Sequence, residues 1–213
     1  MLKLIVFDCD GVMFDSKKAN CMYYNHLLAH FGLPSMNIDE EDYVHMNSVA
    51  DSVQHIFRHY PKPALEEVHD FRKSCGYAPF LAYMEMEADL PEFLQITSSN
   101  YHLAISTNRT DTMLPLLSRY KLEGYFGKVV TAATAKRPKP APDGLLEILS
   151  FYGCTAEETL FIGDSIIDEQ HAASCGVPLI AFKNPNLQAA YHVNGFREIL
   201  ELPPFLQPAK YQG

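Results

Sequence analysis

Apolar and polar residues follow two different rhythms along this chain. An apolar run at residues 2–8 predicts a buried strand at the start. Residues 16–32 then place apolar side chains at helical spacing, with Ser16 suited to a helix start and Gly32 to a helix end. The pattern that follows stays helix-like and shows no clear strand, so we expect a small helical domain over residues 16–87.

The second rhythm begins after residue 88, where short apolar runs alternate with amphipathic helices. This alternation is typical of a parallel sheet with helices on both faces, a doubly wound, Rossmann-like α/β domain. Counting the first run as a strand, we expect about five strands in a core domain made of residues 1–15 and 88–213. The expected elements are, in order, the strand 101–107, the helix 112–120, the strand 127–132, the helix 143–153, the strand 159–164, the helix 165–176 and the strand 177–182.

Composition narrows the class of protein and its partners. With 213 residues, 47% of them hydrophobic and 20% charged, the chain suits one globular domain that carries an insertion. A net charge of −9 argues against a nucleic-acid surface and makes small molecules the expected partners. Five scattered cysteines without a CxxC pair indicate neither a disulfide framework nor a zinc site. Because no apolar run approaches the length of a membrane span, we expect a cytoplasmic protein without a membrane partner.

The first strand ends in two carboxylates, Asp8 and Asp10. Side chains two residues apart on a strand point the same way, so both can face one site. Close carboxylates repel each other, and a bound cation or a retained proton relieves that repulsion. The stretch DCDG is equally compatible with a solvated turn, because Asp and Gly are common turn residues. The first strand alone therefore leaves both interpretations open.

Polar residues that suit phosphoryl chemistry follow the other strands. Ligands of doubly wound sheets bind at the carboxyl ends of the strands. Thr107, Lys139 and Asp164 fall at or after such ends, and Asp168 lies four residues beyond the last of them. Carboxylates at low number suit Mg²⁺, which keeps waters and accepts a phosphate oxygen, and a carboxylate can also be the nucleophile in phosphoryl transfer. We therefore expect a site for a divalent cation and a phosphoryl group.

Four segments resemble the motifs of the haloacid dehalogenase-like hydrolases, in that family's order. They are FDCDGVMFDS, ISTN, KPAPD and IGDSIIDEQHAASCGV. Within the family the chain is similar to the phosphoglycolate phosphatase and beta-phosphoglucomutase branch, which inserts a helical cap after the first motif. Four motifs in register are more specific than one, so the resemblance disfavours the solvated turn at Asp8 and Asp10.

The resemblance implies a role for each matching residue. Asp8 is the implied nucleophile, and Asp10 is the implied acid that protonates the leaving alcohol and the base that then activates water. Thr107 is expected to hydrogen-bond the phosphoryl oxygens, and Lys139 to neutralise their charge and restrain Asp8. Asp168 either reaches the metal through water or orients Lys139. The implied ligands of Mg²⁺ are Asp8, the backbone carbonyl of Asp10, Asp164 and Asp168.

Three of these residues have a second interpretation. Thr107 could start the next helix as an N-cap, a role that is compatible with phosphate binding. Lys136 or Arg137 could supply the phosphate cation in place of Lys139. Asp168 could be a solvated acid in the first turn of a helix, where it suits the helix dipole.

Substrate recognition involves a second set of candidates. Asn108 ends the second motif and Arg109 follows it, and both either touch the phosphate or solvate their loop. In the helical domain, His45 and Asn47 stand where related proteins present a specificity loop, and they could hydrogen-bond a polar leaving group. The alternative is that this stretch only starts the next helix. Mutase-like members carry a cation in this loop, whereas the stretch here has none before Arg58.

These observations favour a Mg²⁺-dependent phosphoric monoester hydrolase that acts on a small phosphorylated metabolite, similar to phosphoglycolate or a sugar phosphate, through an aspartyl-phosphate at Asp8. A phosphomutase of the beta-phosphoglucomutase type is the alternative, and the missing cap cation weakens it. A non-catalytic phosphate-binding regulator is a third reading, against which the intact Asp8, Asp10, Lys139 and Asp164 argue. The sequence leaves a monomer and a homodimer open.

Overall fold

Two units of the chain fold around separate cores. The structure is a computed structural model that describes residues 1–46 and 49–206. One unit comprises Met1–Phe14 and Met86–Gly213, and the other comprises Asp15–Glu85. These bounds differ by one or two residues from the expected core and helical domains.

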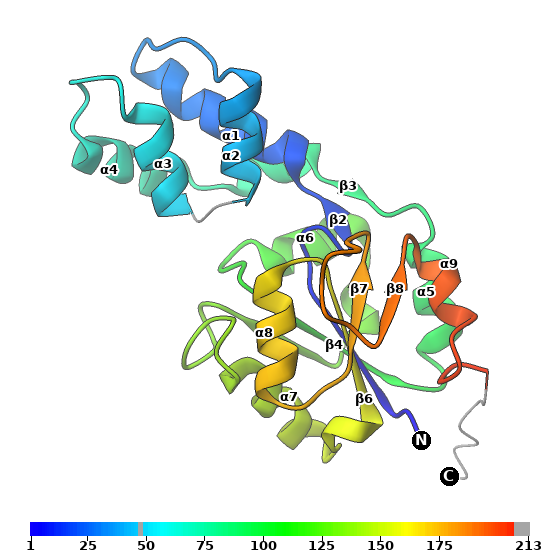
Figure 1. The fold of residues 1–213 in the computed structure, drawn as a ribbon. Helices are drawn as coiled ribbons and strands as arrows, with labels where there is room; N and C mark the ends of the chain where they lie inside the picture. The colour runs from blue at the N-terminus through cyan, green and yellow to red at the C-terminus, as the bar shows by residue number, and fades with distance from the viewer. Residues whose placement is uncertain (47–48, 207–213) are drawn as a thin grey trace. The chain divides into compact units, whose positions relative to one another are not determined.

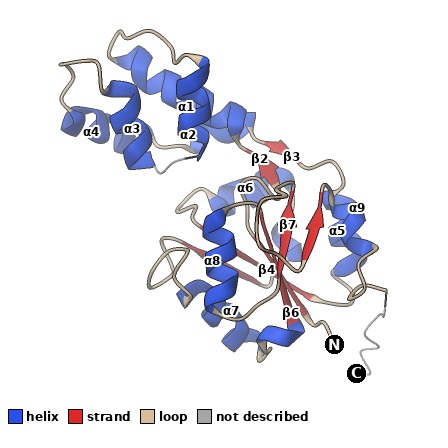
Figure 2. Cartoon of the chain, in the orientation of Figure 1, coloured by secondary structure: helices blue, strands red, loops and turns tan. Residues whose placement is uncertain are grey.

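A six-stranded parallel sheet forms the centre of the first unit (Figure 2). Its order is β5-β4-β1-β6-β7-β8, so β1 lies between β4 and β6. This sheet and its flanking helices confirm the predicted α/β fold class. About five strands were expected, and the sixth, β8, is a short edge strand with an exposed histidine that offers little apolar pattern. The strands are β1 (Leu4–Phe7), β4 (His102–Thr107), β5 (Lys128–Thr131), β6 (Thr159–Gly163), β7 (Leu179–Phe182) and β8 (Tyr191–Val193).

Helices cover both faces of this sheet. In Figure 1, α7 and α8 lie on one side of the strands and α5 and α9 on the other. Neighbouring residues of a strand serve different faces, because side chains alternate. The helices are α5 (Leu90–Thr97), α6 (Met113–Tyr120), α7 (Asp143–Tyr152), α8 (Ile166–Ser174) and α9 (Phe196–Leu200), with 3-10 turns at Glu123–Tyr125 and Ala156–Glu158. The sequence pattern did not predict α5 and α9.

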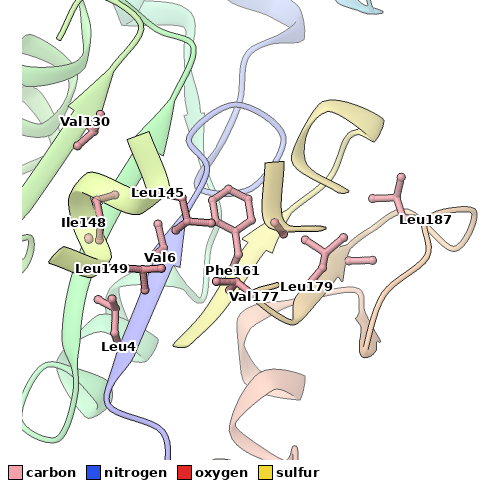
Figure 3. Packing of buried hydrophobic residues seen from close by; sticks show 13 residues of the cluster. Leu4, Val6, Val130, Leu145, Ile148, Leu149, Phe161, Val177, Leu179 and Leu187 are labelled. Atoms are coloured by element: carbon pink, nitrogen blue, oxygen red, sulfur yellow. The ribbon is translucent and has the colours of Figure 1, made fainter. Parts of the chain in front are cut away.

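The two faces of the sheet have different interiors. Val6 and Phe161 belong to an aliphatic cluster that α7 and α8 complete (Figure 3). On the other face Phe7 packs edge-on against Phe93 and tilted against Phe196, which come from α5 and α9. The central strand β1 is therefore buried on both sides, and burial of this apolar surface is the main driving force that fixes its position.

The second unit consists of helices around a core rich in aromatic rings. Its interior includes Tyr23, Tyr24, Phe57 and Phe80. Its helices are α1 (Lys17–His30), α2 (Ile38–Met46), α3 (Val49–Phe57) and α4 (Leu65–Cys75), followed by a 3-10 helix at Ala78–Tyr83. Two short strands, β2 (Phe14–Asp15) and β3 (Glu85–Met86), form a separate two-stranded sheet that the sequence pattern did not predict.

The ends of α1 differ in one detail from the prediction. Ser16 does occupy the N-cap position of α1, but its side chain makes no capping hydrogen bond. Gly32 follows the helix with φ +70°, a left-handed conformation that favours glycine. No helix in the described ranges is long and apolar enough to cross a membrane.

The strand order decides where the candidate site lies. Because β4, β1 and β6 are adjacent and parallel, their carboxyl ends meet at one edge of the sheet. Thr107 is the last residue of β4, Asp8 follows β1 directly, and Asp164 follows β6. Three residues that are far apart in the sequence thus come to one edge.

Candidate active site

Asp8 is the first residue after the carboxyl end of the central strand β1, and it is almost completely buried. Its backbone N–H donates to the carbonyl of Ile162 at 2.9 Å, which continues the strand pairing by one residue. The chain then turns at Gly11, whose φ of +76° favours glycine. A Cβ at Gly11 would lie 1.9 Å from Oδ2 of Asp164, so glycine is also needed to admit that carboxylate. The glycine after the two aspartates therefore brings the first and fourth motifs together.

A buried ion-pair network joins Asp8, Lys139 and Asp168. Lys139 Nζ lies 2.7 Å from Asp8 Oδ1 and 2.6 Å from Asp168 Oδ1. The second oxygen of Asp168 accepts from the hydroxyl of Ser165 at 2.7 Å and from the backbone N–H groups of Ser165 and Asp164 at 3.2 Å. Both oxygens of Asp168 are thus engaged within the protein. This geometry suits an orienting role toward Lys139.

Burial and neighbouring charge shift the pKa values of these groups in different directions. Burial, helped by the charge of Asp168, raises the pKa of Asp8 to about 7. Burial and the charge of Asp8 likewise raise the pKa of Asp164 to about 8. The pKa of Asp168 is lowered despite its burial, because Lys139 and Ser165 stabilise its charged form. The paired carboxylates of Asp8 and Asp168 raise the pKa of Lys139, against the opposing effect of burial. Lys139 is therefore a permanent cation.

Asp8 and Asp164 fit a hard divalent cation. One carboxylate oxygen from each of Asp8, Asp164 and Asp168 lies within 4.8 Å of the others. In the described part of the chain, neither side-chain oxygen of Asp164 is assigned a hydrogen bond, and the backbone carbonyl of Asp164 is fixed by the Asn184 amide at 2.7 Å. The carboxylates of the buried Asp8 and the half-buried Asp164 have raised pKa values and repel each other when both are charged, and a cation would relieve that repulsion. Oxygen donors alone are the set that Mg²⁺ and similar ions prefer.

Asp10 lies at the same strand end but has a different partner. Its carboxylate receives two hydrogen bonds from Arg109, from Nε at 2.8 Å and from Nη2 at 2.7 Å. Arg109 Nη1 also donates to the hydroxyl of Thr112 at 3.1 Å. The side chain of Asp10 is 38% exposed, whereas that of Arg109 is 8% exposed. The Arg109 side chain is buried and therefore does not simply solvate its loop, whereas its contact with a phosphate group stays a prediction.

The loop after β4 fixes Thr107 and the backbone of Lys139. The hydroxyl of Thr107 accepts from the N–H of Arg109 at 3.1 Å, and α6 begins only after Thr112. Thr107 is therefore not an N-cap, and that alternative is wrong. The side chain of Asn108 donates to the carbonyl of Lys139 at 3.1 Å and accepts from its N–H at 2.9 Å. Asn108 thus clamps the lysine segment.

The remaining candidates lie outside this network or outside the described residues. Arg137 is exposed and pairs with Asp143, with Nη2 at 2.8 Å from the carboxylate, and Lys136 is exposed as well. The structure therefore brings Lys139 to Asp8 in place of either alternative cation. His45 is an exposed residue of α2, and Asn47 lies outside the described residues.

A buried histidine beside the site was not predicted from the sequence. His171 on α8 is fully buried and bridges Ser106 and Ala141, with Nε2 3.0 Å from the serine hydroxyl and Nδ1 2.8 Å from the carbonyl. Its position three residues after Asp168 was the available signal, because that spacing places both side chains on one face of a helix.

Comparison with known proteins defines the class to which this fold and site belong. The family model described as haloacid dehalogenase-like hydrolase matches residues 5–182. The chain belongs to this family, and the predicted resemblance is confirmed. A solved structure of a haloacid dehalogenase-superfamily hydrolase, subfamily IA, variant 1, from Geobacter sulfurreducens superposes with a TM-score of 0.85 at 33% identity, over 94% of this chain and 95% of that one.

Particular relatives narrow the comparison further. Phosphoglycolate phosphatase 1 of Pseudomonas aeruginosa is 28% identical over 96% of this chain and 75% of its own length. The phosphoglycolate phosphatase of Thiobacillus denitrificans is 24% identical over 94% of this chain and 88% of its own. The beta-phosphoglucomutase of Clostridium difficile shares the fold, with a TM-score of 0.71 at 16% identity over 93% of each chain. Phosphoglycolate phosphatases are therefore similar to this chain in sequence, whereas the beta-phosphoglucomutase is similar to it in fold alone.

Proposed function

We propose that this chain is a phosphatase that hydrolyses a small phosphate ester by way of an aspartyl-phosphate at Asp8. The observation that carries the proposal is the buried contact between Asp8 and Lys139, next to Asp164 and Thr107 at the same sheet edge. A carboxylate beside a permanent cation and a second, unpaired carboxylate is equipped for phosphoryl transfer. The family and the named phosphoglycolate phosphatases support this class of reaction.

The proposed cofactor is Mg²⁺, held by Asp8, the backbone carbonyl of Asp10 and Asp164. When bound, the ion neutralises charge on a phosphate oxygen and on the carboxylates around it. In this proposal Asp168 is a partner of Lys139 and not a metal ligand, because both its oxygens already accept hydrogen bonds. The ion therefore has two carboxylate ligands and keeps waters for its other positions, as Mg²⁺ prefers.

The protein groups have separate tasks in the proposed reaction. Asp8 attacks phosphorus, and Lys139 with the Thr107 hydroxyl stabilises the negative charge on the transferred group. Asp10, whose carboxylate accepts two hydrogen bonds from Arg109, takes a proton from the attacking water in the second step. To protonate the leaving alcohol in the first step, Asp10 must itself carry a proton, which weakens its pair with Arg109. The Asp10–Arg109 contact is thus expected to rearrange between the two half-reactions.

Substrate selectivity is proposed to reside in the helical unit and at Arg109. The phosphoryl site is the same for every ester, so discrimination must come from contacts to the leaving group. Phosphoglycolate and small sugar phosphates are the proposed substrates, on the ground that the named relatives include phosphoglycolate phosphatases. Location in the cytoplasm is proposed with them, supported by five free cysteines. Both a monomer and a homodimer are compatible with the proposal.

Release of inorganic phosphate from a panel of phosphorylated metabolites tests this function. A phosphatase releases phosphate in proportion to substrate consumed, with phosphoglycolate and sugar phosphates compared directly. A phosphomutase would convert beta-glucose 1-phosphate into an isomer without net release. A non-catalytic regulator would bind phosphate esters without consuming any of them. The last two outcomes would each overturn the proposal.

A further inference from the structure

The imidazole of His171 makes two directed hydrogen bonds inside the α/β unit. The carbonyl of Ala141 lies 2.8 Å from Nδ1, and the hydroxyl of Ser106 lies 3.0 Å from Nε2. A carbonyl only accepts, so Nδ1 carries the hydrogen and Nε2 accepts from the hydroxyl of Ser106. Burial and the nearby charge of Lys139 lower the pKa of His171 to about 4. The ring is therefore neutral and has one defined tautomer.

This single ring connects three segments that carry proposed active-site residues. Ser106 directly precedes Thr107 on β4, and Ala141 lies two residues after Lys139. His171 itself comes one helical turn after Asp168 on α8. The Phe161 ring and the imidazole pack edge to face, with ring centroids 5.5 Å apart, which limits rotation of the imidazole. The histidine thus lies where the second, third and fourth motifs meet.

The segment around Lys139 is held at two points along its backbone. Asn108 clamps the peptide groups of Lys139 itself, as described above. His171 holds the carbonyl of Ala141, and the N–H of Ala141 closes a turn onto the carbonyl of Pro138 at 3.0 Å. A lysine side chain has a long, flexible stem, so its ammonium is placed accurately only if its backbone is fixed. The two clamps supply that restraint from β4 and from α8.

We propose that His171 is a positioning residue that holds the Lys139 segment against β4 and so sets the place of the lysine ammonium between Asp8 and Asp168. The donor at Nδ1 is the part of the ring that makes this restraint, because it acts directly on the lysine segment. A shift of about 1 Å in a catalytic group can cost about 100-fold in rate. The kinetic consequence rests on the proposed phosphatase function.

Two amide variants of His171, each of which replaces one ring nitrogen, distinguish a positioning role from a packing role. His171→Asn retains an N–H donor near the place of Nδ1, whereas His171→Gln reaches the place of Nε2 and loses that donor. Both remove the ring that packs on Phe161, so both are expected to lower the melting temperature to a similar extent. We expect kcat of His171→Gln to fall by about 10- to 100-fold and kcat of His171→Asn to stay within about threefold of wild type, with KM changed little in both.

A control and an independent measurement complete the test. His192 on the edge strand β8 also bonds a carbonyl, that of Leu187 at 3.0 Å, so His192→Gln should leave kcat unchanged. Equal losses of kcat in the Asn and Gln variants of His171, tracking melting temperature, would overturn the proposal. ¹⁵N NMR of the imidazole should show Nδ1 protonated and Nε2 unprotonated, and the opposite tautomer would overturn the proposal. This measurement does not depend on catalytic activity. If wild type consumed no ester, the proposed function would fail while the NMR result still decided the contact of His171.

Discussion

The α/β unit and the helical unit place their charged side chains in opposite environments. In the α/β unit, Lys139 and Asp168 form an ion pair whose side chains are 5% and 0% exposed. In the helical unit, Lys17 and Asp42 pair at a similar distance of 2.8 Å, but both side chains are 53% exposed. An exposed ion pair contributes little to folding stability. A buried ion pair has a large free-energy cost of desolvation, so its presence indicates a role other than stability. Strongly perturbed carboxylates in a buried cluster are typical of active sites, so we expect the chemistry to take place in the α/β unit.

The largest expected effect comes from the proposed nucleophile. Asp8→Asn keeps the shape of the side chain but removes its negative charge, and we expect turnover to fall by at least about 10⁴-fold. Asp42→Asn makes the same chemical change beside a lysine of the helical unit and should leave turnover unchanged. Phosphate release measured for both variants tests the difference between the two units. An Asp8→Asn protein that retained more than a few per cent of wild-type activity would rule out the nucleophile role.

Metal removal should act on the buried carboxylates of the α/β unit alone. We expect EDTA to abolish turnover and added Mg²⁺ to restore it, because a cation would relieve the repulsion between the carboxylates of Asp8 and Asp164. Ca²⁺ should inhibit, since its higher and looser coordination would misplace Asp8. Circular dichroism should show that the helical unit stays folded throughout. Full turnover in EDTA would end the metal proposal.

Stability should respond differently to loss of a buried and an exposed partner. Asp168→Asn leaves the buried Lys139 with one fewer carboxylate, and we expect a destabilisation on the order of 3 kcal/mol. Asp42→Asn removes the exposed partner of Lys17 and should leave the denaturation midpoint almost unchanged. Urea denaturation of the two variants measures both effects. Equal midpoints would show that burial does not separate these two ion pairs.

The pH dependence of stability in the metal-free protein provides a smaller test. The raised pKa values of Asp8 and Asp164, about 7 and 8, mean that the folded state retains protons that the unfolded state has already released. Stability should therefore fall as pH rises up to about 8, by on the order of 2 kcal/mol above pH 6.5. The lowered pKa of His171, about 4, acts in the opposite direction, but only below the ordinary histidine value of about 6.5.

Melting temperatures between pH 6.5 and 8.5 measure this effect. In EDTA the melting temperature should decline with pH, and saturating Mg²⁺ should flatten the curve by favouring the ionised carboxylates. Asp164→Asn should show a shallower decline than wild type. A flat curve for metal-free wild type would contradict the raised pKa values.

The smallest expected effect lies in the helical unit, at the proposed specificity residues. His45→Ala and Asn47→Ala should lower kcat/KM on the best natural ester by a few-fold, which corresponds to the loss of about one hydrogen bond. The kcat/KM on p-nitrophenyl phosphate should stay unchanged. A residue that only supports a helix start should instead reduce both substrates alike through stability. Parallel kinetics and melting curves distinguish the two. Equal losses on both substrates with a lowered melting temperature would remove these residues from the proposed selectivity.

The sequence by itself determined the fold class and the candidates of the central site. Apolar runs that end in polar residues predicted β1, β4 and β6, because a strand buried on both faces must be apolar along its length. The motifs at the carboxyl ends of β1, β4, β5 and β6 contain Asp8, Thr107, Lys139, Asp164 and Asp168. The short edge strand β8 escaped prediction because it carries little apolar pattern of its own, and the helices α5 and α9 were missed as well.

Only the tertiary structure decided which of these residues are partners. Arg109 and Asp10 are 99 residues apart in the chain, and nothing local indicates that they form a bidentate pair. His171 contacts Ser106 across 65 residues, and its role depends on which strand lies beside α8. Local sequence patterns report periodicity and turn chemistry, whereas hydrogen bonds and pKa shifts depend on groups that meet only after the sheet has assembled. For that reason the sequence predicted which chemical groups belong to the site, whereas their pairing depends on the tertiary structure.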